Sequence, residues 1–186
     1  MKKLLIILLS VIAIFTFAGC GSNNSSSSSS ETSSSSSSSS SIAQDKKQIA
    51  EDKMASIDFD KLNKTTEDQF KNSKTYDMVK DISFEIKNEG GKKTVVMAAI
   101  VSDDISRETL LSLADSMIRS YGSNASMGTD LTPPSKDYYG EIFDAYDIFI
   151  VIVPASDPKH KDYVYEAIPA GAHTNIKIEP TDDFKG

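Results

Sequence analysis

Apolar runs along the chain predict five strands. Residues 78–86 alternate between apolar and polar positions, which is typical of a strand with one buried face. Residues 94–101 and 147–153 are apolar on both faces, so each of these runs predicts a central strand. Two further strands are expected at residues 163–168 and 174–178.

Apolar positions at helical spacing predict two main helices. Residues 42–57 carry a loose apolar stripe behind Ser41, which can act as the N-cap. Residues 106–121 carry a continuous stripe, with Ser106 as the N-cap and Gly122 as the residue that ends the helix. A groove for a partner could use the second stripe, but packing into a core is the favoured interpretation.

Shorter signals predict a helix, a turn and a loop. Thr66 and Gln69 have the spacing of a capping box, which predicts one short helix between the first helix and the first strand. Gly90 and Gly91 predict a hairpin turn, because glycine adopts positive φ without strain. Residues 138–145 approach the next strand as a helical turn.

These elements predict a single α+β domain over residues 42–186. We expect a mostly antiparallel sheet of about five strands with two main helices packed on it. Two of the strands are apolar on both faces, yet only two solid helices are available to cover them. Either one helix covers each face, or one face is left for a partner.

The amino terminus has the pattern of an export signal. Lys2 and Lys3 precede residues 4–18, fifteen residues interrupted only by one serine and one threonine. A membrane-spanning helix needs about 20 apolar residues, so this run has the length of a secretory signal instead. We interpret residues 1–19 as a signal peptide.

The signal peptide ends in Phe17-Ala18-Gly19-Cys20, which resembles the lipobox of bacterial lipoproteins. This resemblance implies a diacylglyceryl group on the Cys20 sulfur, cleavage before Cys20 by signal peptidase II, and acylation of the new amino terminus. It also implies that the protein is anchored by lipid to the extracytoplasmic face of a cell membrane. The lysine- and isoleucine-rich style suits a Gram-positive lipoprotein.

A serine tract separates the lipidated cysteine from the domain. Sixteen of the twenty residues at 22–41 are serine. With almost nothing apolar to bury, this segment is expected to be a flexible tether. Its root-mean-square span would be roughly 25 Å and its full reach about 70 Å. Glycosylation of its hydroxyl groups remains an alternative role.

The formal net charge of −7 limits the classes of partner. Removal of Lys2 and Lys3 with the signal peptide leaves 18 basic side chains against 27 acidic ones, a net charge of −9. An acidic protein repels phosphate backbones, so nucleic acid is not an expected partner. Cys20 is the single cysteine, so neither a disulfide nor a thiolate metal site can form within one chain.

No catalytic, metal or cofactor motif is found in the sequence. His160 lies in a charged loop and His173 lies near the last predicted strand, without the spacing of metal ligands. Ser156 and Lys159 have the Ser-x-x-Lys spacing of penicillin-recognising enzymes, but the companion Lys-Thr-Gly is absent. We therefore expect no enzyme, no cofactor and no metal.

The favoured function is a membrane-anchored, non-catalytic interaction domain with an unknown protein or envelope partner. Its candidate binding residues are Pro133, Pro134, Tyr138 and Tyr139, together with any uncovered face of the sheet. These tyrosines are also ordinary residues for strands. Two alternatives stay open: a small cell-envelope hydrolase that uses His160 or His173, and an accessory subunit of a membrane complex.

Overall fold

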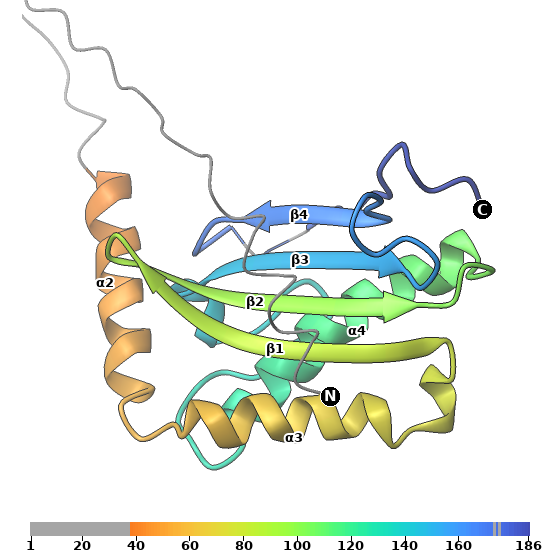
Figure 1. The fold of residues 1–186 in the computed structure, drawn as a ribbon. Coiled ribbons are helices and arrows are strands. Elements are labelled where there is room, and N and C mark those ends of the chain that lie inside the picture. Colours follow the sequence, from red (N-terminus) through yellow and green to blue (C-terminus); the bar gives the residue numbers. More distant parts are fainter. Residues whose placement is uncertain (1–37, 173, 175) are drawn as a thin grey trace, which may run out of the picture. The chain divides into compact units, whose positions relative to one another are not determined.

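The computed structural model describes residues 38–172, 174 and 176–186, and their side chains from Asp45 onward. These residues form three α-helices, two short 3-10 helices and a four-stranded sheet. Figure 1 shows how the helices and the sheet are arranged. In chain order these elements are α2 Ser38–Lys53, α3 Phe59–Lys71, η1 Lys74–Tyr76, β1 Val79–Glu89, β2 Lys92–Val101, α4 Arg107–Ser126, η2 Glu141–Asp144, β3 Asp147–Pro154 and β4 Val164–Ile168.

The sheet is mixed and has the strand order β1-β2-β3-β4. Strands β1 and β2 are antiparallel and join through Gly90 and Gly91, whose φ angles of 59° and 79° confirm the predicted hairpin turn. Strands β2 and β3 are parallel, because α4 carries the chain back across the sheet between them. The α+β class is therefore confirmed. The expectation of a mostly antiparallel sheet of about five strands with two main helices is met only roughly, because the described residues form four strands with one parallel pairing and three α-helices.

The described residues of the predicted fifth strand, 174 and 176–178, form no strand. Thr174 makes one isolated bridge with Tyr138 and no ladder with another strand. Ile176 and Ile178 pack against the hydrophobic core from an irregular segment. The alternation of apolar and polar residues here therefore reflects packing on the core and not a strand. As a result, β4 is an edge strand of the sheet.

Helix α4 begins as predicted and ends later than predicted. The Ser106 side chain accepts a hydrogen bond from the backbone N–H of Thr109, which confirms it as the N-cap. Gly122 does not end the helix, which continues to Ser126. A Cβ atom on Gly122 would lie 2.2 Å from the carbonyl oxygen of Tyr139. Glycine stands here because the following chain packs directly on the helix backbone.

Helix α3 is longer than the capping pattern predicts. It begins at Phe59, and the Asp58 side chain caps it by accepting from the N–H of Lys61. Thr66 is not a cap but a buried residue in mid-helix, where its hydroxyl donates to the carbonyl oxygen of Leu62. The predicted helix is therefore confirmed, but the capping box at Thr66 and Gln69 is wrong.

Helix α2 includes the end of the serine tract. It begins at Ser38, so Ser41 lies inside the helix and is not its N-cap. Serine disfavours a helix by only about 0.5 kcal/mol per residue, which downstream packing offsets. That packing comes from Ala50 and Met54, which are buried in the core. The earlier tether residues, Cys20 and the signal peptide lie outside the described residues.

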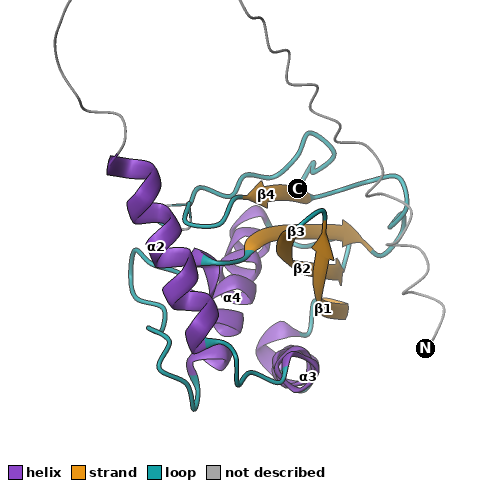
Figure 2. Ribbon diagram, turned by 90° about the vertical axis from the view of Figure 1, so that its left-hand side faces the viewer, coloured by secondary structure: helices purple, strands orange, loops and turns teal. Residues whose placement is uncertain are grey.

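The three helices that the structure describes lie on one side of the sheet. Figure 2 views the sheet nearly edge-on, with α2, α3 and α4 to the left of and below the strands. Alternate side chains of the strands join these helices in one hydrophobic core. Within the described part of the chain, no helix has the length and apolarity needed to cross a membrane.

Candidate binding surface

The strand side chains that point away from the helices form a second, largely apolar surface. Most of their neighbours in each strand belong to the core, and side chains alternate between the two faces. The register places Ile100 beside Val153, and places Tyr165 beside Val151. We call this surface the outer face; its apolar members are Val96, Ala98, Ile100, Phe149, Val151, Val153, Tyr165 and Ala167.

The outer face is most accessible around its margin. Its central members Val96, Ala98 and Val151 are 4%, 6% and 9% exposed, while Tyr165 is 37% exposed. The rings of Phe149 and Tyr165 meet edge-to-face with centroids 5.0 Å apart. Such a pair is worth roughly 1 kcal/mol beyond the burial of its area. The two rings therefore form a fixed apolar feature that spans β3 and β4.

Strand β1 gives the outer face a polar rim. Its residues on this face include Asp81, Glu85 and Lys87, which lie opposite Ile100, Val96 and Thr94 of β2. No helix or strand that the structure describes packs over the outer face (Figure 2). An apolar centre with a polar rim on one side is the usual organisation of a protein–protein interface.

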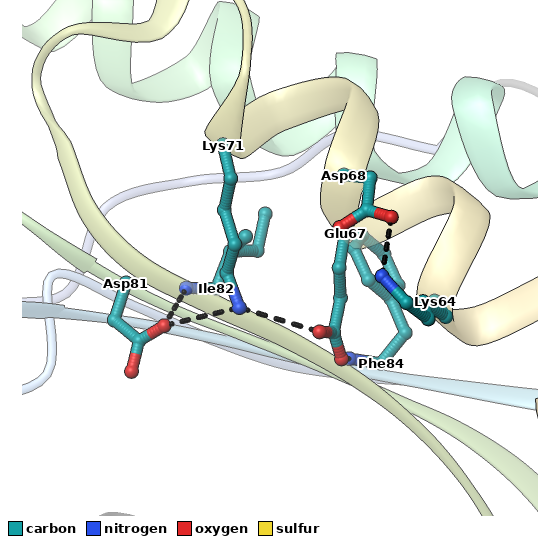
Figure 3. A network of polar contacts seen from close by, with 7 residues as sticks. All are labelled: Lys64, Glu67, Asp68, Lys71, Asp81, Ile82 and Phe84. Carbon is teal, nitrogen blue, oxygen red and sulfur yellow. Dashed lines mark hydrogen bonds and ion pairs between the residues drawn. The ribbon is translucent and has the colours of Figure 1, made fainter. Parts of the chain in front are cut away.

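The free edge of β1 is closed by side chains from its own fold, as Figure 3 shows. Glu67 Oε1 accepts a hydrogen bond from the Phe84 N–H at 3.2 Å, and Asp81 Oδ1 accepts from the Ile82 N–H at 2.9 Å. Lys71 Nζ lies 3.3 Å from Glu67 and 3.4 Å from Asp81. Burial opposes the charge of Lys71, but the two carboxylates raise its pKa.

The structure brings the four sequence-predicted binding residues together, beside α4 and away from the outer face. Pro133 is exposed, whereas Pro134 lies against Gly122. Tyr138 is half-buried, and its hydroxyl lies 3.2 Å from Asp144 Oδ2. Tyr139 is 6% exposed and belongs to the core.

Tyr139 is held in place by two residues of α4. Its hydroxyl donates to Asp115 Oδ1 at 2.6 Å, and the Arg119 guanidinium lies 4.4 Å from its ring centroid. Burial and the Asp115 carboxylate raise the pKa of Tyr139 to about 12. Arg119 also donates to the carbonyl oxygens of Ser135 and Lys136, which fixes the loop on the helix.

The groups considered for catalysis form separate pairs. His160 is exposed, and its Nδ1 lies 2.7 Å from Asp157 Oδ1. The Ser156 hydroxyl donates to Asp103 Oδ1 at 2.6 Å, which lowers the pKa of Asp103. No hydrogen bond joins Ser156 to His160 or Lys159 within the described residues. His173 and Cys20 lie outside them.

The described residues hold no group of three or more histidine, cysteine, aspartate or glutamate side chains that could bind a metal ion. Comparisons with known proteins gave no match to any family model, curated protein or solved structure.

Two contacts that fix parts of the fold have no signal in the sequence pattern. Glu67 and Lys71 have helical i,i+4 spacing, which predicts their ion pair but not the contact of Glu67 with the edge strand. Glu141 binds Lys53 at 2.6 Å and accepts from the Thr132 N–H at 2.7 Å. These groups are 88 and 9 residues apart in sequence, so local periodicity does not relate them.

Proposed function

We propose that the protein is a lipid-anchored, extracytoplasmic interaction protein without catalytic activity. The lipobox-like end of the signal peptide supports lipid attachment at Cys20. The serine tract supports a tether between that lipid and the domain. The domain then captures a protein partner away from the lipid surface.

The observation that carries the binding role is the outer face of the sheet. All three described helices pack on the opposite side, yet the central strands carry apolar residues on both sides. Antiparallel sheets that have one face in water usually carry polar side chains on that face. The outer face carries apolar side chains instead. An apolar outer face is therefore best accounted for by a partner.

The occupant that fits is a protein with an apolar patch. Residues 22–37, which would precede α2 in the mature protein, contain no hydrophobic side chain that could cover the outer face. Burial of the Phe149 and Tyr165 rings would supply most of the apolar contact. The net negative charge of the protein favours a partner whose patch has basic neighbours.

Site-specific crosslinking in living cells tests the outer face. A photoreactive side chain at Tyr165 or at Ile100 should yield the same adduct, because both positions lie on this face. The same group at Lys64, an exposed residue of α3, should not yield it. Val153→Asp should abolish the adduct by placing a charge within the face. Equal adducts from Lys64, or an adduct unaffected by Val153→Asp, would contradict the proposal.

Lipid attachment has its own test. Cells that express the wild-type chain should incorporate labelled fatty acid into the protein, and cells that express Cys20→Ser should not. The wild-type protein should also remain in the membrane fraction, since two or more acyl chains hold a protein stably. Equal labelling of both proteins would contradict the anchor while leaving the binding role of the domain to the crosslinking experiment.

A further inference from the structure

The two edges of the sheet differ in their protection. At β1, the carboxylates of Glu67 and Asp81 accept from the outward N–H groups of Phe84 and Ile82. Natural sheets close their edges in such ways because an open edge pairs with other chains. Strand β4 forms the opposite edge.

The ladder between β2 and β3 identifies which backbone groups of β4 point outward. The N–H of Ala155 donates to the carbonyl oxygen of Val101 at 2.9 Å, so alternate residues of β3 direct their backbone groups to β2, and Ile148, Ile150 and Ile152 direct theirs to β4. Their partners on β4 are Val164, Glu166 and Ile168, which leaves the N–H and C=O of Tyr165 and Ala167 pointing outward. Nowhere in the described part of the chain does a hydrogen bond from outside the sheet reach these four groups. We call them the β4 edge.

We propose that the β4 edge binds an extended, basic segment of a partner protein. The segment pairs antiparallel with residues 165–167 and places a lysine or arginine opposite Glu166. The two hydrogen-bonded pairs at Tyr165 and Ala167 supply four main-chain bonds. Partner side chains at these two pairs point to the outer face beside the Tyr165 ring, which favours apolar residues there.

The position of Glu166 on β4 favours a basic residue in the partner segment. It lies between Val164 and Ile168 on the core-facing side of β4, next to Ile150 of β3, and is only half-buried. A charge that points inward on an edge strand disfavours indiscriminate pairing. A cation directly opposite turns the same charge into a favourable cross-strand pair. The net charge of −7 also favours the approach of a basic segment.

A second copy of the chain fits the β4 edge poorly. Thr181 already occupies the edge at Tyr163, so two copies could pair only about their Glu166 residues. That register sets two glutamates directly opposite one another, which is destabilising. The chain's own residues 22–37 fit no better, because they include no basic residue.

This inference goes beyond the proposed function, because it uses the backbone of one edge and not the side chains of the outer face. Two heptapeptides serve as probes: Ser-Thr-Val-Lys-Val-Thr-Ser and the same peptide with a central glutamate. They are titrated into the full chain in detergent. The lysine peptide should bind with a dissociation constant of about 1 mM or tighter and at least fivefold better than the glutamate peptide. Binding should slow hydrogen exchange at the Tyr165 and Ala167 amides.

Two variants make the test specific. Ala167→Pro removes one outward N–H and should weaken the lysine peptide about tenfold, while Ala167→Ser keeps the N–H and should not. Glu166→Lys should reverse the preference in favour of the glutamate peptide, and it serves as the decisive variant if Ala167→Pro fails to fold. Absence of binding up to about 1 mM, equal binding of both peptides, or an unreversed preference in Glu166→Lys would overturn the proposal.

Discussion

Glu67 of α3 accepts a hydrogen bond from the backbone N–H of Phe84, 3.2 Å away on the edge strand β1. A residue on a helix thereby occupies a backbone group that would otherwise be open to another chain. Lys71, one helical turn later, lies between Glu67 and Asp81 and balances their charge (Figure 3). One face of α3 thus supports the core and closes an edge of the sheet.

Replacement of Glu67 should therefore both destabilise the fold and promote self-association. Glu67→Ala leaves the Phe84 N–H without its acceptor and should lower the free energy of unfolding by about 1–2 kcal/mol. Denaturant unfolding measures this loss, and sedimentation measures association. The matched control is Asp68→Ala, which removes only an exposed pair with Lys64 and should cost less than about 0.5 kcal/mol. Equal behaviour of the two variants would contradict the role of Glu67.

Gly122 should tolerate no side chain. Alanine would normally favour a helix over glycine by about 1 kcal/mol. At this position its Cβ would lie 2.2 Å from the Tyr139 carbonyl oxygen, so Gly122→Ala should destabilise the protein by about 2–4 kcal/mol. Ser123→Ala, at the next and exposed position, should be neutral or slightly stabilising. Thermal unfolding of the two variants distinguishes these outcomes.

Glu141 should make the fold sensitive to acid. Burial opposes its charge, but bonds from Lys53 and Thr132 hold its pKa below the usual 4.5. A carboxylate whose pKa is lowered by folding stabilises the native state at higher pH, and this contribution is lost as pH falls through the folded pKa. The free energy of unfolding should therefore fall below about pH 5.

The variant Glu141→Gln identifies the source of that acid sensitivity. It should lose about 1–2 kcal/mol at neutral pH and show a flatter dependence below about pH 5. Asp45→Asn, which changes an exposed carboxylate on the same helix as Lys53, provides the control. An acid limb that is equally steep in wild type and Glu141→Gln would show that other groups cause it.

Buried tyrosines should limit stability in alkali. Burial raises the pKa values of Tyr121 and Tyr146, and burial together with Asp115 raises that of Tyr139 to about 12. A phenol whose pKa is raised by folding stabilises the native state below its unfolded pKa near 10, and this stability is lost as pH rises toward 12. Ultraviolet titration should show a class of tyrosines that ionises at higher pH than exposed tyrosines. After unfolding, the same tyrosines should ionise with an unperturbed pKa. Tyr139→Phe should remove one member of that class.

The sequence predicts the helices and strands in which the spacing of apolar residues matches the buried face. Strands β1 to β4 lie where the alternating and continuous apolar runs place them, and Ser106 caps α4. Errors arise where one pattern has two meanings. Residues 174–178 alternate because Ile176 and Ile178 pack on the core, and Gly122 is required for a close approach and not for a helix end.

The candidate site is harder to predict because it depends on tertiary pairing. Continuous apolar strands indicate two buried faces, but the sequence leaves open whether a helix or a partner covers the second. The parallel pairing of β2 with β3 and the position of α4 decide this. The sequence suggests Tyr138 and Tyr139 as partly exposed aromatic residues. In the structure Tyr139 is buried, and its hydroxyl donates to Asp115 of α4.

Helix α2 also has a mechanical consequence. Under the proposed anchor, tension between the membrane and a captured partner enters the domain at Ser38, the first residue of α2. Among the side chains that the structure describes, from Asp45 onward, Lys53 of this helix pairs with Glu141 and Glu51 pairs with Lys93. A pulling force would therefore act first on the turns of α2 next to Ser38. Unwinding of these turns would lengthen the tether before the force reached the sheet.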